Sequence, residues 1–169
     1  YLKELEKRGK IKIKRISGCS IGAVLGLMFL IDRLDIAMDV CKKSFTMIRK
    51  TRKTKDIISE EILNTYINDD DIDKVNKILY ITYFDTVKTK QIVKKKYKNK
   101  SELIDCILKT THIPYLTNGN ITYKEGCIDG AFPYIFKTRN DDRKIIFICL
   151  QNLKRLSNMI YIKNEKNIY

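Results

Sequence analysis

Two glycines flank a serine in the segment from Gly18 to Gly22, which reads G-C-S-I-G. This is the G-x-S-x-G pattern of a nucleophile elbow, in which a serine lies on a sharp turn between a strand and a helix. The pattern predicts an exposed hydroxyl on Ser20, and glycines where a side chain would collide with neighbouring backbone. The N–H groups near Ile21 and Gly22 would lie at a helix N-terminus, where they can donate to a developing oxyanion. The expected chemistry is nucleophilic attack by the serine.

A serine hydroxyl is a poor nucleophile until a base takes its proton, so the chain must supply a base. The one histidine, His112, stands just before Pro114 with no acidic neighbour in sequence, which is more typical of a surface or packing residue than of a triad member. The better candidate is Asp129, which lies between a short apolar run and the Gly130-Ala131 pair. The alternative for this aspartate is a simple Asp-Gly turn, in which it bonds its own downstream backbone.

Strand-like and helix-like patterns alternate along the chain. Residues 10–16 alternate Lys and Ile, as in a strand with one polar side, and residues 21–31 form an apolar run typical of a buried helix. No repeat or interdomain linker is visible, so we expect one α/β domain over residues 1–169, with helices on the faces of a sheet. Further helices are predicted at 1–8, 35–48, 59–68 and 101–109, the last capped by Ser101, and further strands at 78–84, 121–124 and 144–150.

The composition is that of a folded protein, with 44% hydrophobic and 32% charged residues, but the net charge is +14. Such a charge favours an anionic partner, which would be nucleic acid, an acidic membrane surface or a charged substrate. The alternative is a bias toward lysine, with the lysines forming solvated faces, because they are scattered over the whole length. Lysine-rich loops are predicted at residues 49–55 and 94–100.

Five cysteines lie far apart and form no C-x-x-C pair, which indicates neither a zinc site nor a disulfide framework and fits a reducing intracellular compartment. No signal peptide is visible. The longest apolar run, residues 21–31, is too short to span a bilayer, which needs about 20 residues. Because the chain begins at Tyr1 rather than Met, we expect a fragment or a processed product.

The G-x-S-x-G segment and the later D-G-A segment, taken together, resemble the patatin-like phospholipase family. The resemblance runs from Tyr1 to about Pro133. Residues 1–5 resemble the end of the family's first helix, and residues 12–26 resemble its strand, elbow and central helix. Residues 79–90 resemble its next core strand and the polar turn behind it. Residues 108–131 resemble the segment that leads to the family's catalytic aspartate.

The resemblance implies a three-layer fold with a central, mostly parallel sheet flanked by helices. It also implies a dyad without histidine, in which Ser20 is the nucleophile and Asp129 the general base, and it implies no metal and no cofactor. The remaining site positions would be the elbow and oxyanion backbone at Gly18, Ile21 and Gly22, and the motif after the base at Gly130 and Ala131.

The sequence departs from the family pattern in two places. The family's glycine-rich oxyanion loop, G-G-G-x-R/K-G, has no counterpart, and its place would lie before Tyr1, so we expect the domain to lack that loop and its first strand. The family's small residues before the proline loop are replaced by Thr110, Thr111 and His112. His112 could therefore line the acyl pocket.

The leading interpretation is a lipid acyl hydrolase of the phospholipase A type, acting on phospholipids or neutral lipids. Its lysine-rich loops would hold it on an anionic membrane, as a cytoplasmic or peripheral membrane protein. A second interpretation is a catalytically impaired member that binds lipid or membrane surfaces, because the glycine-rich loop is missing. The third, a basic nucleic-acid-binding protein, is disfavoured because no nucleic-acid motif is present and the tyrosines do not cluster with the lysines.

Overall fold

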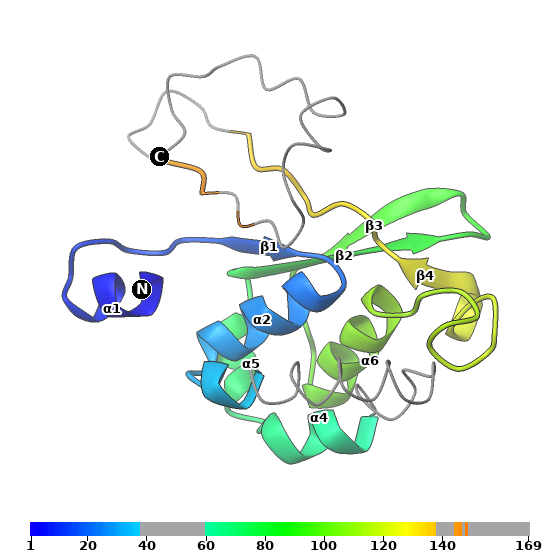
Figure 1. Ribbon diagram of the computed structural model, residues 1–169, viewed down its shortest axis with the longest axis horizontal. Coiled ribbons are helices and arrows are strands. Elements are labelled where there is room, and N and C mark those ends of the chain that lie inside the picture. Colours follow the sequence, from blue (N-terminus) through cyan, green and yellow to red (C-terminus); the bar gives the residue numbers. More distant parts are fainter. Residues whose placement is uncertain (38–59, 138–143, 147, 149–169) are drawn as a thin grey trace. The chain divides into compact units, whose positions relative to one another are not determined.

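The computed structural model of the protein describes residues 1–37, 60–137, 144–146 and 148 (Figure 1). The chain divides into two units, Tyr1–Tyr134 and Ile135–Tyr169, and the named helices and strands all lie in the first.

Two sequence predictions fall wholly or largely outside the described residues. They are the basic loop at 49–55 and the helix at 35–48, of which only the first residues are described. In the strand predicted at 144–150, the described residues belong to no strand.

A small mixed sheet is built around one central strand. Of its neighbours, one is parallel to it and two are antiparallel. The strands are β1 (Ile16–Gly18), the central β2 (Leu79–Asp85), β3 (Lys90–Lys94) and β4 (Cys127–Asp129), and β1 is the parallel neighbour.

The pairing register fixes which strands share a side of β2. Both β3 and β4 pair with residues 83–85 of β2, so they lie on opposite sides of it. Both β1 and β3 pair with Ile81, so β1 and β3 also lie on opposite sides. Therefore β1 and β4 lie on the same side of β2, one after the other along its length.

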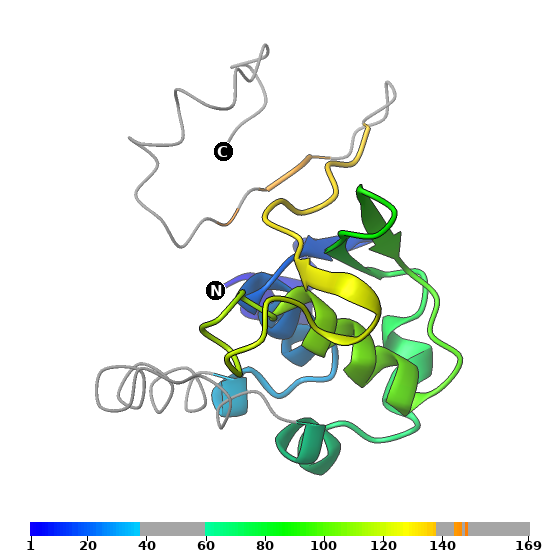
Figure 2. The same ribbon diagram turned by 90° about the vertical axis from the view of Figure 1, so that its right-hand side faces the viewer.

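The helices of the first unit lie on one side of this sheet (Figures 1 and 2). They are α1 (Leu2–Lys7), α2 (Ile21–Leu30), α4 (Glu60–Tyr66), α5 (Asp71–Val75) and α6 (Lys100–Thr110), with a short 3-10 turn, η1 (Lys124–Gly126), before β4. Helices α2 and α6 both pack against β2, whose Leu79 and Ile81 are fully buried in the core. This packing holds the helix after the elbow firmly on the sheet.

The α/β class predicted from the sequence is confirmed, but the prediction of a mostly parallel sheet is wrong for the described strands. Only the β1–β2 pair is parallel. A tight turn between Asp85 and Lys90 reverses the chain, which makes β3 antiparallel to β2. Because the described helices cover one face of the sheet, the three-layer arrangement stays a prediction.

Two strand predictions need correction, and one strand was not predicted. Residues 10–15 are irregular, and the strand begins only at Ile16. The strand predicted at 121–124 is wrong, because residues 124–126 form a 3-10 turn and the strand follows at β4. The sequence also gave no indication of β3, because K-Q-I-V-K carries only two apolar residues and is typical of a polar turn.

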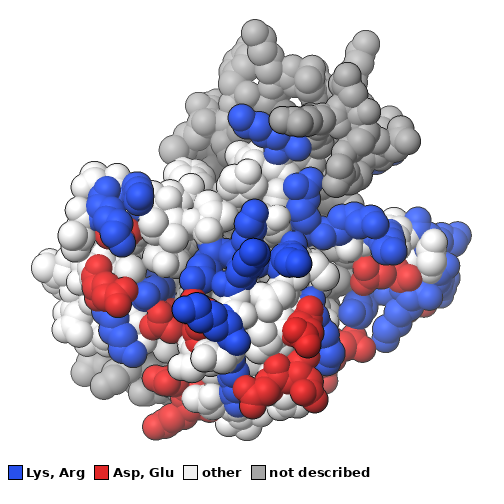
Figure 3. All heavy atoms as spheres, turned by 180° about the vertical axis from the view of Figure 1, so that it is seen from behind, with Lys and Arg blue, Asp and Glu red and all other residues white. Residues whose placement is uncertain are grey.

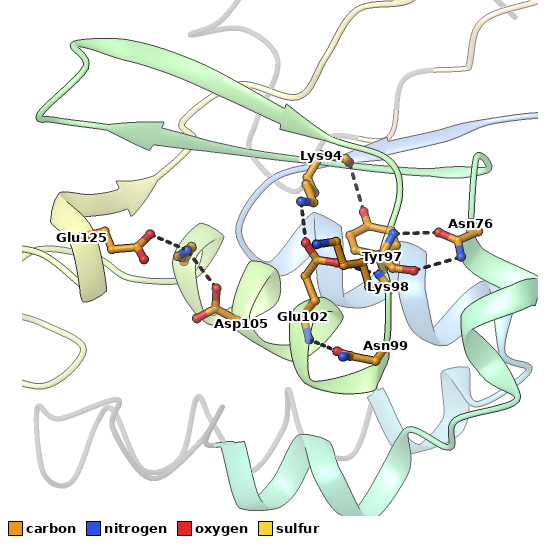
Figure 4. A network of polar contacts seen from close by, with 9 residues as sticks. Asn76, Lys94, Tyr97, Lys98, Asn99, Glu102, Asp105 and Glu125 are labelled. Atoms are coloured by element: carbon orange, nitrogen blue, oxygen red, sulfur yellow. Dashed lines mark hydrogen bonds and ion pairs between the residues drawn. The ribbon is translucent and has the colours of Figure 1, made fainter.

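The N-terminus of α6 is capped by Asn99 and not by Ser101, as the sequence pattern predicted. Asn99 Oδ1 accepts a hydrogen bond from the Glu102 N–H at 2.9 Å. Glu102 in turn accepts from Lys94 Nζ and from the Lys98 N–H, both at 2.6 Å, which ties the end of β3 to the first turn of α6 (Figure 4). These hydrogen bonds hold the pKa of Glu102 below its usual value, with the Lys94 contact the larger cause.

The Asn99→Ala variant should lower the free energy of unfolding by about 1 kcal/mol, because it leaves a helix N-terminal N–H without its acceptor. Ser101→Ala is the matched control and should change it little, since Ser101 is exposed and does not cap the helix. Urea unfolding followed by circular dichroism measures both values. A larger loss in Ser101→Ala than in Asn99→Ala would show that the cap is assigned to the wrong residue.

Candidate active site

The backbone at Ser20 has the strained geometry of a nucleophile elbow. Its φ is 52° and its ψ is −135°, a combination that residues with a side chain rarely adopt. Ser20 is the N-cap position of α2, but its side chain makes no capping hydrogen bond. The hydroxyl is therefore not used to stabilise the helix, and the strain is retained at a residue that is partly exposed.

Gly18 is required by the elbow, as predicted. A Cβ atom at this position would lie 2.6 Å from the Gly22 carbonyl and from the Ala23 nitrogen, and these are backbone atoms that cannot move aside. The same prediction for Gly22 is wrong, because a Cβ there would meet no atom within 4 Å. Gly22 lies in the first turn of α2 and faces open space, so sterics do not demand a glycine there.

One oxyanion donor remains at the elbow. The Gly22 N–H, which the sequence nominated, donates to the Cys19 carbonyl oxygen at 2.9 Å, and the Ala23 N–H donates to the Ser20 carbonyl oxygen at 3.0 Å. Among the described residues, the Ile21 N–H has no acceptor. Ile21 is therefore the donor that the elbow can offer to an oxyanion.

The sheet register brings Asp129 to the elbow. Gly18, at the end of β1, pairs with Ile81, and Asp129, at the end of β4, pairs with Tyr83. Because both strands lie on the same side of β2 and run toward each other, their ends meet with only Thr82 between their partners.

The electrostatics agree with this placement. The pKa of the Cys19 thiol is raised to about 11, first by burial and next by the negative charge of Asp129. Cys19 directly precedes Ser20, so the carboxylate acts on the turn that carries Ser20.

Thr82 links the two motifs. The Ser20 N–H donates to Thr110 Oγ1 at 2.8 Å, and the Thr110 hydroxyl donates to the Thr82 carbonyl oxygen at 2.5 Å. A Cβ at Gly130 would overlap that same carbonyl oxygen, so the D-G-A turn also lies directly against Thr82. The Thr82 hydroxyl donates to the Phe132 carbonyl oxygen at 2.7 Å, which fixes the chain after Asp129. Thr82 and Thr110 are fully buried. The sequence predicted no role for Thr82, and for Thr110 it predicted only that a small residue of the family pattern is replaced.

Asp129 forms the turn that the sequence offered as its alternative role. Its Oδ1 accepts a hydrogen bond from the Ala131 N–H at 2.9 Å, and Ala131 has a φ of 55°. Within the described part of the chain, no hydrogen bond joins Ser20 Oγ to Asp129, and Asp129 Oδ2 accepts none. One carboxylate oxygen thus shapes the turn and the other remains open to receive a proton.

His112 is buried and positions β4 through its backbone. Its carbonyl oxygen accepts a hydrogen bond from the Asp129 N–H at 2.9 Å. The ring is fully buried beside Tyr123, with ring centroids 6.0 Å apart, and neither ring nitrogen has a hydrogen-bond partner among the described residues. A packing role, which the sequence favoured over a triad role, agrees with this burial.

A pocket of about 300 Å³ lies elsewhere, along the outer side of α6, and does not include Ser20 or Asp129. Its acidic side chains are Glu60, Glu102 and Asp105. Lys109 neutralises part of this charge by pairing with Asp105 at 2.9 Å and with Glu125 at 3.2 Å (Figure 4). Within the described ranges, no three His, Cys, Asp or Glu side chains form a group that could hold a metal ion.

Lysine and arginine side chains spread over one face of the molecule, with acidic side chains between them (Figure 3). In the predicted basic loop at 94–100, three lysines are engaged within the fold, and one of them, Lys95, has its Nζ 5.7 Å from the centre of the Tyr80 ring. Lys94 pairs with Glu102, and Lys100 Nζ donates to the Asn64 carbonyl oxygen. Residues 60–134 contain eleven lysines and eleven Asp or Glu, so the charge of this region cancels. None of the described helices is both long and apolar enough to cross a membrane.

Comparison with known proteins gives no match, whether to a family model, to a curated protein or to a solved structure. The resemblance to patatin-like phospholipases stays a prediction that rests on the motifs of this chain.

Replacing Thr110 should loosen the elbow, because its hydroxyl both accepts from the Ser20 N–H and donates to the Thr82 carbonyl oxygen. Thr110→Val keeps the shape but leaves both groups without a partner, so we expect a loss of about 1–3 kcal/mol in the free energy of unfolding. Thr110→Ser keeps the hydroxyl and is the control, with a smaller loss. Equal losses in the two variants, measured by chemical denaturation, would show that the hydroxyl does not join the elbow to the sheet.

Proposed function

We propose that the protein is a serine esterase that cleaves fatty acyl esters of lipids, with Ser20 as nucleophile and Asp129 as general base. The observation that supports this most strongly is the meeting of β1 and β4 at Thr82, which brings the elbow and the D-G-A turn together. The strained backbone of Ser20 adds to it, because such strain clusters at functional sites. The fold would be a patatin-like α/β fold with its Ser-Asp dyad.

In this mechanism Ser20 Oγ attacks the carbonyl carbon of the ester, and its proton passes to the open oxygen of Asp129, Oδ2. The carbonyl oxygen becomes an oxyanion and accepts a hydrogen bond from the Ile21 N–H, a contact of a kind typically worth about 3–4 kcal/mol. The C–O bond to the alcohol then breaks, and the alcohol leaves with the proton from Asp129. A water molecule then attacks the acyl carbon while Asp129 takes its proton. The bond between the acyl carbon and Ser20 Oγ breaks, Asp129 returns the proton to Oγ, and the fatty acid leaves.

The proposal of a lipid substrate is supported by the charge of the chain. A chain of net charge +14 is drawn to anionic lipid surfaces, where phospholipid esters are found. Nucleic acid is disfavoured as the partner because the sequence contains no nucleic-acid-binding motif.

A fluorophosphonate probe tests the proposal, because it reacts covalently with serines that are activated as nucleophiles. We expect one adduct, mapped to Ser20 by mass spectrometry of peptides, and no adduct in Ser20→Ala. An adduct on a different serine that persists in Ser20→Ala would overturn the assignment.

The second candidate, a lipid-binding module without catalysis, is favoured by the hydrogen bonds at Ser20 and Asp129. Asp129 is engaged with the Ala131 N–H, no hydrogen bond from Ser20 Oγ reaches it within the described residues, and the elbow keeps a single open donor. Such a module would leave Ser20 unlabelled by the fluorophosphonate and would still bind lipid vesicles.

A further inference from the structure

The loop that follows α6 carries an unusual concentration of exposed apolar side chains. We call residues 113–121 the apolar loop. Four of its large side chains are exposed: Tyr115 at 68%, Ile121 at 58%, Ile113 at 41% and Leu116 at 38%. From residue 110 to residue 123 the sequence contains no Asp, Glu, Lys or Arg, although 32% of the whole chain is charged. Exposed apolar groups gathered in this way mark an interaction surface.

The apolar loop adjoins the candidate active site. It begins directly after Thr110 and His112, which contact the Ser20 N–H and the Asp129 N–H respectively. Phe132, three residues after Asp129, is also half exposed. The base of the loop is therefore joined to both motifs of the candidate site.

The backbone of the apolar loop satisfies many of its own polar groups. The N–H groups of Tyr115, Leu116 and Thr117 donate to carbonyl oxygens inside the loop or at its base, and the Ile113 N–H donates to Thr117 Oγ1 at 2.8 Å. A segment that enters an apolar medium is favoured when its backbone groups are paired internally and it carries no charge. The N–H groups named above are paired, and the loop contains no charged residue. Tyr115 has a φ of 62°, so the fold holds its most exposed side chain outward at the cost of backbone strain.

The positive charge of the rest of the chain indicates which kind of surface the apolar loop would bind. Residues 42–55 contain seven Lys or Arg and no Asp or Glu, and the whole chain carries +14. Basic segments attract a protein to an anionic bilayer, while exposed apolar side chains enter it, and the two together give stable binding.

We propose that the apolar loop is a docking surface that inserts into anionic phospholipid bilayers and presents Ser20 to the lipid. The inference rests on the proposed function for its consequence in catalysis, but the docking itself can be measured without catalysis. If the loop docks in this way, the site would act on lipid in a bilayer rather than on a dissolved ester.

The absence of tryptophan from the chain gives a direct test. Tyr115→Trp and Tyr1→Trp each introduce a single tryptophan at an exposed tyrosine. The second is the control, because Tyr1 is 93% exposed and lies just before α1. On addition of phosphatidylglycerol vesicles, the emission at position 115 should shift to the blue and be quenched by brominated lipid. The emission at position 1 should not change. Equal behaviour of the two, or no change at either, would overturn the proposal.

The Tyr115→Ser/Ile121→Ser variant gives the second measurement. In a Ser20→Ala background, its affinity for the same vesicles should fall tenfold or more. In the active protein it should slow hydrolysis of vesicle lipid but not of a short dissolved ester. If the variant still binds vesicles as tightly and the protein hydrolyses esters, the docking proposal is refuted and the proposed function is not. If the unaltered protein binds vesicles through the loop but hydrolyses neither ester, the proposed function is refuted and the docking is not. Conversion of a dimer to a monomer in these variants, without loss of vesicle binding, would assign the loop to contacts between copies of the chain.

Discussion

The Asp129→Asn variant should lose about 10²- to 10⁴-fold in kcat for ester hydrolysis, which is the range that a general base supplies. Asparagine keeps the Oδ1 atom that accepts from the Ala131 N–H, so the turn should survive. It removes only the charge and the proton-accepting oxygen. Asp73→Asn, on the exposed surface of α5, is the matched control and should keep its activity. Full activity in Asp129→Asn would remove this residue from the mechanism.

A second readout of the same variant does not depend on catalysis. The negative charge of Asp129 helps to raise the pKa of the Cys19 thiol to about 11, although burial is the larger cause. Removing the charge favours the thiolate, so the pKa of Cys19 should fall in Asp129→Asn, and alkylation at a fixed alkaline pH should become faster. Peptide mass spectrometry at several pH values measures this. An unchanged rate for Cys19 would contradict the placement of Asp129 at the elbow.

The Gly18→Ala variant should be severely destabilised, by about 3 kcal/mol or more. The new methyl group would lie 2.6 Å from the backbone of Gly22 and Ala23, and relief would require α2 to move away from β1. Helix α2 is packed in the core of the first unit, so that movement would expose buried apolar surface.

Gly22→Ala is the control for this effect, because both glycines belong to the G-x-S-x-G pattern. A methyl group at Gly22 meets no atom within 4 Å, and alanine favours helix formation over glycine by up to about 1 kcal/mol. Its stability should therefore stay the same or rise. Thermal and urea unfolding of the two variants side by side measures the difference, and similar losses in both would contradict the elbow geometry.

The sequence predicted α2 and β2 from their strong patterns, although the alternating Lys and Ile residues at 10–16 enter a strand only at Ile16. The uncharged run after Ser20 becomes the buried helix α2, and the β-branched and aromatic run at 78–84 becomes β2. The prediction from sequence failed where single hydrogen bonds decide which of two neighbouring residues takes a structural role. Asn99 and Ser101 are both good capping residues, and only the Asn99 side chain is placed to accept from the Glu102 N–H. Strand β3 forms because β2 offers it an open edge, although its own residues are mostly polar.

At the candidate site, too, residues in short sequence motifs could be proposed from the sequence, and residues that act only through tertiary contacts could not. Ser20 and Asp129 were found because each stands in a short motif with distinctive neighbours. Thr82 and Thr110 were missed because their role exists only in three dimensions, where a hydroxyl from α6 bridges the elbow to β2. A buried threonine inside an apolar strand was the only signal for Thr82, and threonine is common in strands.

Hydrolysis of a fatty acyl ester by the purified protein, compared with Ser20→Ala, tests the assignment of the nucleophile most directly. We expect measurable turnover by the unaltered chain and a rate indistinguishable from buffer in Ser20→Ala, with the two proteins equally folded by circular dichroism. Equal hydrolysis by both proteins, or none by either, would contradict the proposal that Ser20 is the nucleophile of an esterase.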